Sequence, residues 1–189
     1  MGSFWGHFNT VVSHKRLVFY HARKIGIPYR GFVHDMSKFL PCEFFAGAKY
    51  YAAGKRSPNE IQRETFGYSS AWLHHKGVNK HHFEYWTDYS PTERRIMPVK
   101  MPYVYLLEMF CDRVAASKVY QGKNYTDSHP ADYFLKGKEK RSIHPETSDA
   151  LEELLMMLKE KGEDYTFSYI RKNRKKLEME YNGKRSDVL

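Results

Sequence analysis

Residues 10–25 read TVVSHKRLVFYHARKI, and this stretch carries the clearest helical pattern in the first part of the chain. Five positions recur at steps of three and four residues, which places them on one helix face: Val11, His14, Val18, His21 and Ile25. Asn9 or Thr10 is a suitable N-cap, and Gly26 followed by Pro28 is typical of a helix end. The stretch therefore predicts an amphipathic helix that turns two histidines inward.

Further helices are predicted over most of the remaining chain. The sequence pattern, with capping residues, prolines and glycines at its interruptions, favours helices over residues 32–39, 41–53, 58–66, 69–76, 103–120, 147–162 and 167–181. Residues 78–102 contain three prolines and predict loops with a short helical turn, and residues 127–143 read as loop-rich. No alternating strand pattern and no internal repeat is found. The expected fold is an all-α, single-domain helical bundle over residues 1–182, with a frayed tail over 183–189.

Composition limits the class of protein and its partners. With 41% hydrophobic and 28% charged residues, the chain of 189 residues is typical of a globular domain. No apolar run is long enough for a membrane span, and the two cysteines are not in a CxxC pair, so a cytoplasmic protein without membrane contact is expected. A net charge of +9 favours anionic partners such as nucleotides or nucleic acid. The aromatic content of 16% suits either a thick core or a subunit interface.

Histidines are the most informative residues. Eight of the ten precede residue 83, four of them lie within residues 74–82, and Asp35 directly follows His34. Imidazole and carboxylate together suit Zn, Mn, Fe and similar ions. On a helix, adjacent side chains point about 100° apart, so His34 is expected to bind one ion while Asp35 bridges to a second. The central prediction is therefore a site for one or two divalent metal ions.

Other ligands must come from other helices. His14 is a candidate because it lies on the apolar face of the first predicted helix. Asp112 is another, in an otherwise apolar helix with Glu108 one turn earlier. A carboxylate that faces inward would be stabilised by a metal, and one that faces outward would meet solvent or pair with Arg113.

Three motifs, preceded by His14, carry a resemblance to known proteins. HDMSK at residues 34–38, HHFE at 81–84 and LEMFCD at 107–112 are similar to elements of the HD-domain superfamily of metal-dependent phosphohydrolases. More closely, residues 8–125 resemble a family of short bacterial and phage proteins of unknown function. The phrases HDMSKF, AWLHHKGVNKHHFEYW and EMFCDRVAASKVY carry that second resemblance.

The superfamily resemblance implies a helical active site for phosphate esters. It implies four core ligands, which are His14, His34, Asp35 and Asp112. A second metal site would be completed by His81, His82 and one or both of His74 and His75. Asp35 would bridge two ions, drawn from Mn, Fe, Ni and Zn, and Lys38 would face the phosphate of a phosphorylated small molecule or nucleotide. Glu84 or a histidine would assist proton transfer. The expected activity is hydrolysis of a phosphomonoester or phosphodiester.

Departures from the superfamily pattern narrow this expectation. Ser37 stands where the superfamily usually has glycine, and Tyr85 with Trp86 replaces the GYP element, which argues against a cyclic-dinucleotide phosphodiesterase. Thr10 stands where that branch often has a glutamate, which argues against a third metal. The main alternative is a non-catalytic, metal-stabilised protein that binds nucleic acid through basic residues 171–176, or a phage accessory protein. Further alternatives are an HNH-type nuclease, suggested by HHKGVNKHH at residues 74–82 but disfavoured by the close spacing and the lack of strand signals, and histidines with a purely structural role.

Overall fold

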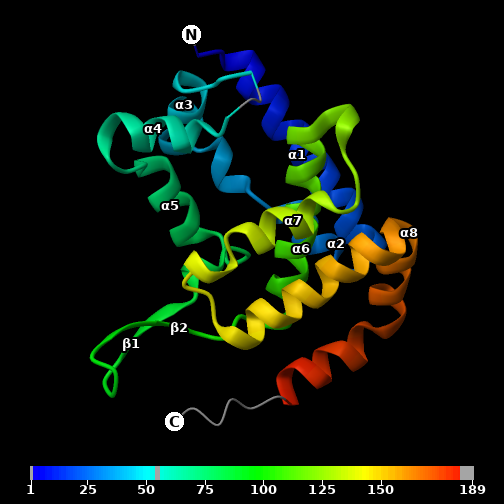
Figure 1. The fold of residues 1–189 in the computed structure, drawn as a ribbon. Coiled ribbons are helices and arrows are strands. Elements are labelled where there is room, and N and C mark those ends of the chain that lie inside the picture. The colour runs from blue at the N-terminus through cyan, green and yellow to red at the C-terminus, as the bar shows by residue number, and fades with distance from the viewer. Residues whose placement is uncertain (1, 54–55, 184–189) are drawn as a thin grey trace.

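Helices α1 (Phe4–Lys24) and α6 (Tyr103–Gln121) pack along each other at the centre of the molecule (Figure 1). The computed structural model describes residues 2–53 and 56–183. Helix α1 begins six residues before the predicted start at Thr10, because Ser3 caps it by accepting a hydrogen bond from the backbone N–H of Gly6. Its buried side chains still lie at the predicted spacing: Val11, His14, Val18, His21 and Ala22.

The chain after α1 returns along it in a short helix, α2 (Pro28–Val33). A Cβ atom at Gly31 would lie 2.6 Å from the Cβ of Ala22, so glycine permits the close approach of the two helices. The predicted continuous helix over residues 32–39 is wrong. The backbone leaves helical geometry at His34 and Asp35 and resumes as a 3₁₀ helix, η1 (Met36–Phe39).

Three helices follow η1, and the first of them packs on α1 and on the other two. They are α3 (Pro41–Lys49), α4 (Pro58–Phe66) and α5 (Ser70–Val78), followed by the short turn η2 (Phe83–Tyr85). Proline occupies the first turn of α3 and of α4, and Ser69 caps α5, in agreement with the expected starts. Helix α3 ends at Lys49, four residues before its predicted end.

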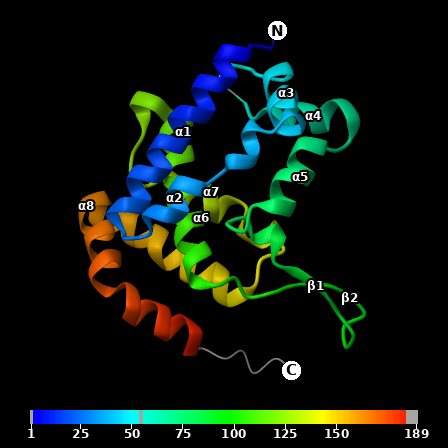
Figure 2. The same cartoon turned by 180° about the vertical axis from the view of Figure 1, so that it is seen from behind.

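A two-stranded antiparallel hairpin contradicts the prediction that the chain has no strands. Strands β1 (Thr87–Ser90) and β2 (Arg95–Pro98) pair with Tyr89 opposite Ile96. The hairpin projects from the helical body (Figure 2). Each strand has four residues and is largely exposed, so burial imposes no alternation of apolar and polar positions that a sequence pattern could reveal.

The last third of the chain is more helical than expected. Residues 127–143 contain α7 (His129–Lys136) between the turns η3 (Gly122–Asn124) and η4 (Lys138–Lys140). Helix α8 (Pro145–Gly183) packs on α6 and α7, and Gly162 breaks it with non-helical angles of φ 80° and ψ 170°. That break agrees with the predicted helix end at Gly162. The predicted frayed tail lies, apart from Gly183, outside the described residues.

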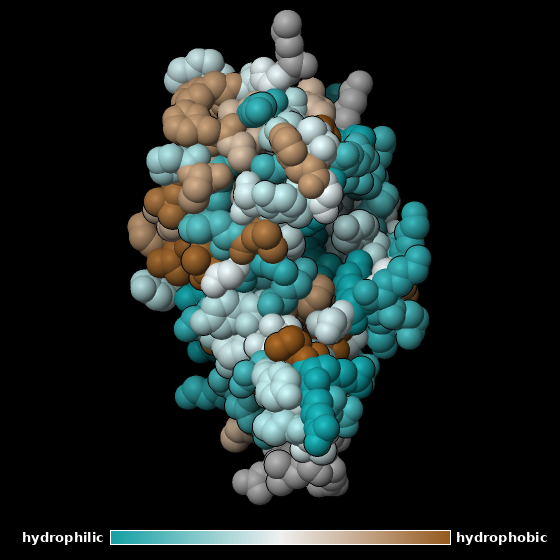
Figure 3. All heavy atoms as spheres, turned by 90° about the vertical axis from the view of Figure 1, so that its left-hand side faces the viewer, coloured by the Kyte–Doolittle hydropathy of each residue, from teal (hydrophilic) through white to brown (hydrophobic). Residues whose placement is uncertain are grey.

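A single apolar cluster runs from Val18 to Tyr181 and joins α1, α6, α7 and α8. The fold is thus predominantly helical, with the small hairpin as the only sheet among residues 2–53 and 56–183. None of the described helices has both the length and the apolar character needed to cross a bilayer. On the face shown in Figure 3, apolar side chains gather along one side and hydrophilic ones along the other. Exposed apolar residues of α1, α2 and α3, and of the junction between η1 and α3, include Trp5, Phe32, Leu40 and Phe45.

Candidate metal centre

Asp35 lies at the centre of a buried polar cluster, in the connection between α2 and η1. Its backbone is left-handed, with φ 53° and ψ 29°, a conformation that aspartate tolerates better than most residues with a side chain. Only 2% of the residue is exposed. Backbone strain of this kind is concentrated at functional sites, and here it sends His34 and Asp35 into the same interior space. The expected arrangement of this pair on a continuous helix is therefore wrong.

The two carboxylate oxygens of Asp35 face different partners. Its Oδ1 lies 3.3 Å from His75 Nε2 and 3.4 Å from His81 Nε2. Its Oδ2 lies 3.3 Å from His34 Nε2 and 2.7 Å from Lys38 Nζ. Asp35 is consequently placed between two sets of nitrogen atoms, as a bridging carboxylate would be.

Helix α6 supplies two more carboxylates, one turn apart. Asp112 Oδ1 lies 2.9 Å from His14 Nε2 and 3.6 Å from His34 Nε2. Glu108 Oε1 lies 3.0 Å from His34 Nδ1 and 3.2 Å from His81 Nδ1. Glu108 thus orients two rings from behind, in the way that carboxylates outside a metal site orient ligating histidines. The other oxygen of Glu108 accepts a hydrogen bond of 2.7 Å from Arg30 Nε.

Glu43, on α3, plays the same part for His75 and was not among the residues singled out from the sequence. Its oxygens lie 2.8 Å from His75 Nδ1 and 2.6 Å from His74 Nδ1. His75 is buried and turns its Nε2 to Asp35, whereas the side chain of His74 is 36% exposed. The structure therefore places His75 in the cluster and His74 outside it. No spacing rule in the sequence links Glu43 to either histidine.

Ligand-type atoms converge in overlapping groups in which all atoms lie within 4.8 Å of one another. These groups bring together seven of the eight predicted ligands: His14, His34, Asp35, His75, His81, His82 and Asp112. The Nε2 atoms of His34, His81 and His82 and Oδ1 of Asp35 are buried and have no hydrogen-bond partner among the described residues. Buried polar atoms are normally paired, so this convergence fits a divalent cation.

The charges of the cluster suit the same chemistry. Burial raises the pKa of Asp35 and Asp112. His34 beside Asp35, and His14 with His34 beside Asp112, outweigh this effect and hold both pKa values well below the usual value. Burial raises the pKa of Glu108, but His34 and His81 outweigh this effect and lower the pKa to about 2. The carboxylates are therefore anionic. Burial lowers the pKa of His14 and His82, which keeps these imidazoles neutral and able to donate a lone pair.

One side of the cluster is open. The side chains of His34, Asp35, His75 and His81 are at most 4% exposed and form its floor. Asp112 and Lys38 keep 20% and 31% of their side chains exposed. Glu84, on η2, lies outside the convergent groups, and its buried Oε2 has no hydrogen-bond partner among the described residues. A ligand would therefore approach past Asp112 and Lys38.

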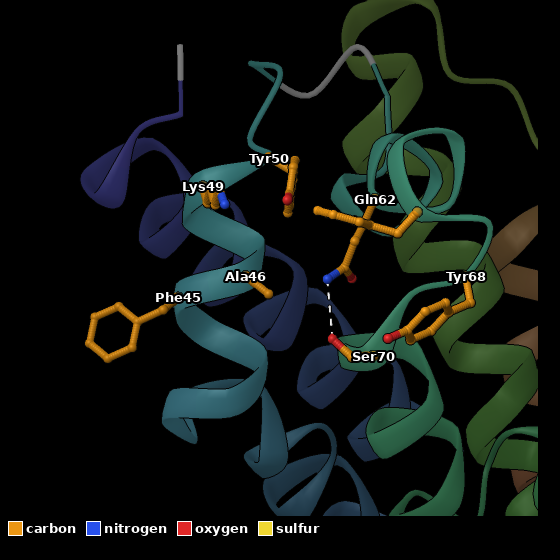
Figure 4. A pocket seen from close by; sticks show the side chains of 8 residues that line it. Phe45, Ala46, Lys49, Tyr50, Gln62, Tyr68 and Ser70 are labelled. Carbon is orange, nitrogen blue, oxygen red and sulfur yellow. Dashed lines mark hydrogen bonds between the residues drawn. The ribbon is translucent and has the colours of Figure 1, made fainter.

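A pocket on the surface lies apart from this cluster. It has a volume of about 420 Å³, and its lining includes Phe45, Lys49, Gln62 and Tyr68 (Figure 4). Gln62 is held at its base by a hydrogen bond of 3.1 Å from Nε2 to Ser70 Oγ. The pocket shares no residue with the convergent histidine groups, so it does not lead directly to the candidate metal centre.

Comparison with known proteins gives a family but no activity. Searches among curated proteins and among solved structures find no match to this chain. A family described as a family of unknown function (DUF5662) matches residues 3–157. That span contains every residue of the convergent groups and ends within α8, before Gly162. The chain belongs to this family of unknown function, DUF5662.

Proposed function

We propose that this protein is a metal-dependent phosphohydrolase with an HD-domain-like helical fold. The observation that carries the proposal is the convergence, on the carboxylate of Asp35, of buried imidazole nitrogens that have no hydrogen-bond partner among the described residues. Supporting it, His14, His34, Asp35 and Asp112 meet from three separate elements in the chain order typical of the HD-domain superfamily. The mixture of histidine and carboxylate ligands suits Mn, Fe, Ni or Zn.

Two ions would share Asp35. One would be held by His14, His34, Asp35 and Asp112, and the other by Asp35, His75, His81 and His82. Asp35 suits the shared position because its two oxygens already face different histidines. Ions bound there would neutralise charge on a phosphoryl group and lower the pKa of a water molecule. Glu108 and Glu43 would keep the rings of His34, His81 and His75 in orientation.

Lys38 would bind the phosphate of the substrate. Its ammonium group lies at the open side of the cluster, 2.7 Å from Asp35 Oδ2, with 31% of the side chain exposed. An ammonium is a compact charge that pairs well with phosphate oxygen. A cluster histidine or Glu84 would assist proton transfer; the histidines belong to the convergent groups around Asp35, and Glu84 does not. The expected substrates are phosphomonoesters or phosphodiesters, including nucleotides, in keeping with the net charge of +9.

We place the reaction in the cytoplasm. Cys42 and Cys111 are both free, as expected of a protein that is kept in a reducing compartment.

A nucleic-acid-binding protein without catalysis is the second candidate. Its support is the exposed basic face of α8, which includes Lys172 and Lys175. Two arginines of the same run are engaged within the chain, because Arg171 and Arg174 donate hydrogen bonds to backbone carbonyls at the end of α1. Salt-sensitive binding of DNA or RNA, without hydrolysis of any phosphate ester, would favour this candidate.

The first experiment is elemental analysis of protein purified without a metal-affinity step. Wild type, Asp35→Ala and His129→Ala are compared, because His129 is a partly exposed histidine on α7, outside the convergent groups. We expect about one to two equivalents of Mn, Fe, Ni or Zn in wild type and in His129→Ala, and a loss in Asp35→Ala. Metal-free wild type would overturn the proposal.

Activity is then measured on an aryl phosphomonoester, an aryl phosphodiester and nucleoside monophosphates. Hydrolysis that disappears in Asp35→Ala and falls by roughly 10²-fold or more in Lys38→Met is expected, since Lys38 stabilises charge that develops on phosphate. A metal-loaded protein that hydrolyses none of these phosphate esters would contradict the catalytic part of the proposal.

A further inference from the structure

Arg113 is a partly buried arginine that the cluster itself does not use. It follows Asp112 on α6 and stands on the neighbouring face of the helix. Its Nε atom is buried without a hydrogen-bond partner, and no carboxylate of residues 2–53 and 56–183 lies within ion-pair distance of the group. Leaving the Nε–H donor of a charged guanidinium unpaired away from water is costly. The position is therefore suited to an anion that the chain does not supply.

A second arginine lies beside the same aromatic ring as Arg113. The guanidinium of Arg113 lies 5.4 Å from the ring centre of Phe134, and that of Arg141 lies 5.4 Å from the same ring. Arg141 is held in place by hydrogen bonds to the backbone carbonyls of Phe134 and Tyr133. Burial first, and then the charge of Arg141, lower the pKa of Arg113. Two arginines thus share one aromatic ring, and in the described part of the chain neither has a carboxylate within ion-pair distance.

Arg113 is also close to the open side of the cluster. It directly follows Asp112 on α6, so its backbone is next to that of a candidate metal ligand. Asp112 is the partly exposed carboxylate at that opening. A ligand with one phosphate at Asp35 and Lys38 would therefore have its next group near Arg113.

We propose that Arg113, supported by the charge of Arg141, binds a second phosphate group of the substrate, so that the preferred substrates carry two phosphates. This inference rests on the proposed function for the position of the first phosphate. The planar fork of arginine matches phosphate oxygens, and two cations suit a multiply charged group better than a single carboxylate. Arg113 would act in binding and specificity, and the groups around Asp35 would act on the scissile phosphate.

The test compares inorganic phosphate with pyrophosphate by isothermal titration calorimetry. Wild type, Arg113→Met and Arg95→Met are titrated as purified and again after metal removal. Methionine keeps apolar contact with Phe134, and Arg95 is a matched control on the hairpin with 66% of its side chain exposed. We expect pyrophosphate to bind wild type more tightly than phosphate. Arg113→Met should lose roughly tenfold or more in pyrophosphate affinity and much less in phosphate affinity.

The possible outcomes separate this inference from the proposed function. Equal pyrophosphate affinity in wild type and Arg113→Met would overturn the inference, as would an equal loss for both anions. Metal content that stays normal in Arg113→Met would show that the centre is intact. If wild type carries no metal but still binds pyrophosphate through Arg113, the anion site stands and the proposed function fails.

Discussion

The two adjacent histidines of α5 point into different environments, which makes them a matched pair. His75 Nε2 lies 3.3 Å from Asp35 Oδ1, whereas His74 contacts Glu43 from the solvent side. We expect His75→Ala to lose at least one equivalent of metal and His74→Ala to retain the wild-type content. Elemental analysis of both variants, prepared identically, provides the measurement. Equal metal loss in the two variants would show that both histidines are ligands.

Glu108 allows a test of the residues that orient the candidate metal ligands. It faces the Nδ1 atoms of His34 and His81 and is fully buried. Glu108→Gln keeps the shape but removes the charge that stabilises both rings, so metal affinity should fall by roughly 10–100-fold. Competition with a chelator measures the affinity. Glu93→Gln, on the exposed hairpin, is the control that should leave it unchanged.

At the residue scale, the sequence identifies candidate metal ligands but not the residues that orient them. His34, Asp35 and Asp112 stand out because charged or polar side chains interrupt otherwise apolar surroundings. Glu43 does not stand out, because one glutamate at the start of a helix is common and its partners lie more than 30 residues away. Only the packing of α3 against α5 shows what it contacts.

At the element scale, the break in α8 depends on one backbone position. Gly162 has φ 80° and ψ 170°, a combination that is essentially restricted to glycine. The following residue, Glu163, donates its N–H to Asp127 over 3.0 Å, which fixes the break. Gly162→Ala should therefore lower the free energy of unfolding by about 1–3 kcal/mol.

Urea unfolding followed by circular dichroism measures the effect of Gly162→Ala. The control is Gly77→Ala in α5, where the φ value is not positive and a new Cβ would meet nothing within 4 Å. That variant should be neutral or stabilising by up to about 1 kcal/mol, because alanine favours helix. Equal stability of Gly162→Ala and wild type would show that α8 can straighten at this point.

Helices with strong caps and clear apolar faces were predictable, and exposed or short elements were not. Helices α4 and α5 begin and end within about two residues of their expected limits, since proline, serine and glycine mark them. Helix α7 has eight residues in a polar stretch, and its burial comes from packing on α8. The helix expected over 32–39 fails because Asp35 adopts φ 53° to enter the cluster, a tertiary demand that overrides local propensity.

For the whole molecule, charged groups connect three helices away from the candidate metal centre. His21 of α1 is fully buried, and its Nε2 lies 3.4 Å from Lys118 Nζ of α6 and 3.9 Å from Glu163 Oε1 of α8. Lys118 and Glu163 also form an ion pair with each other. His21 was predicted to face inward, but the distance of two helical turns from His14 leaves it outside the metal cluster.

Because His21 links α1 to α6 and α8, its protonation should affect the stability of the whole fold. Burial, and then the charge of Lys118, lower its pKa from 6.5 to about 4. The unfolded chain therefore takes up the proton first as pH falls. Stability from this group is complete above about pH 6.5 and is lost progressively as pH falls toward about 4, by about 3 kcal/mol at most.

The measurement is urea unfolding of wild type and His21→Gln at about pH 7.5 and about pH 5. Glutamine cannot titrate, so the loss of stability on acidification should be smaller in the variant, although its stability at the higher pH is reduced by imperfect packing. Comparing the change with pH within each protein removes that packing cost, and the cluster histidines contribute equally to both. An identical pH dependence in the two proteins would mean that His21 takes up no additional proton on unfolding, and that the Lys118–Glu163 pair holds α6 and α8 together without it.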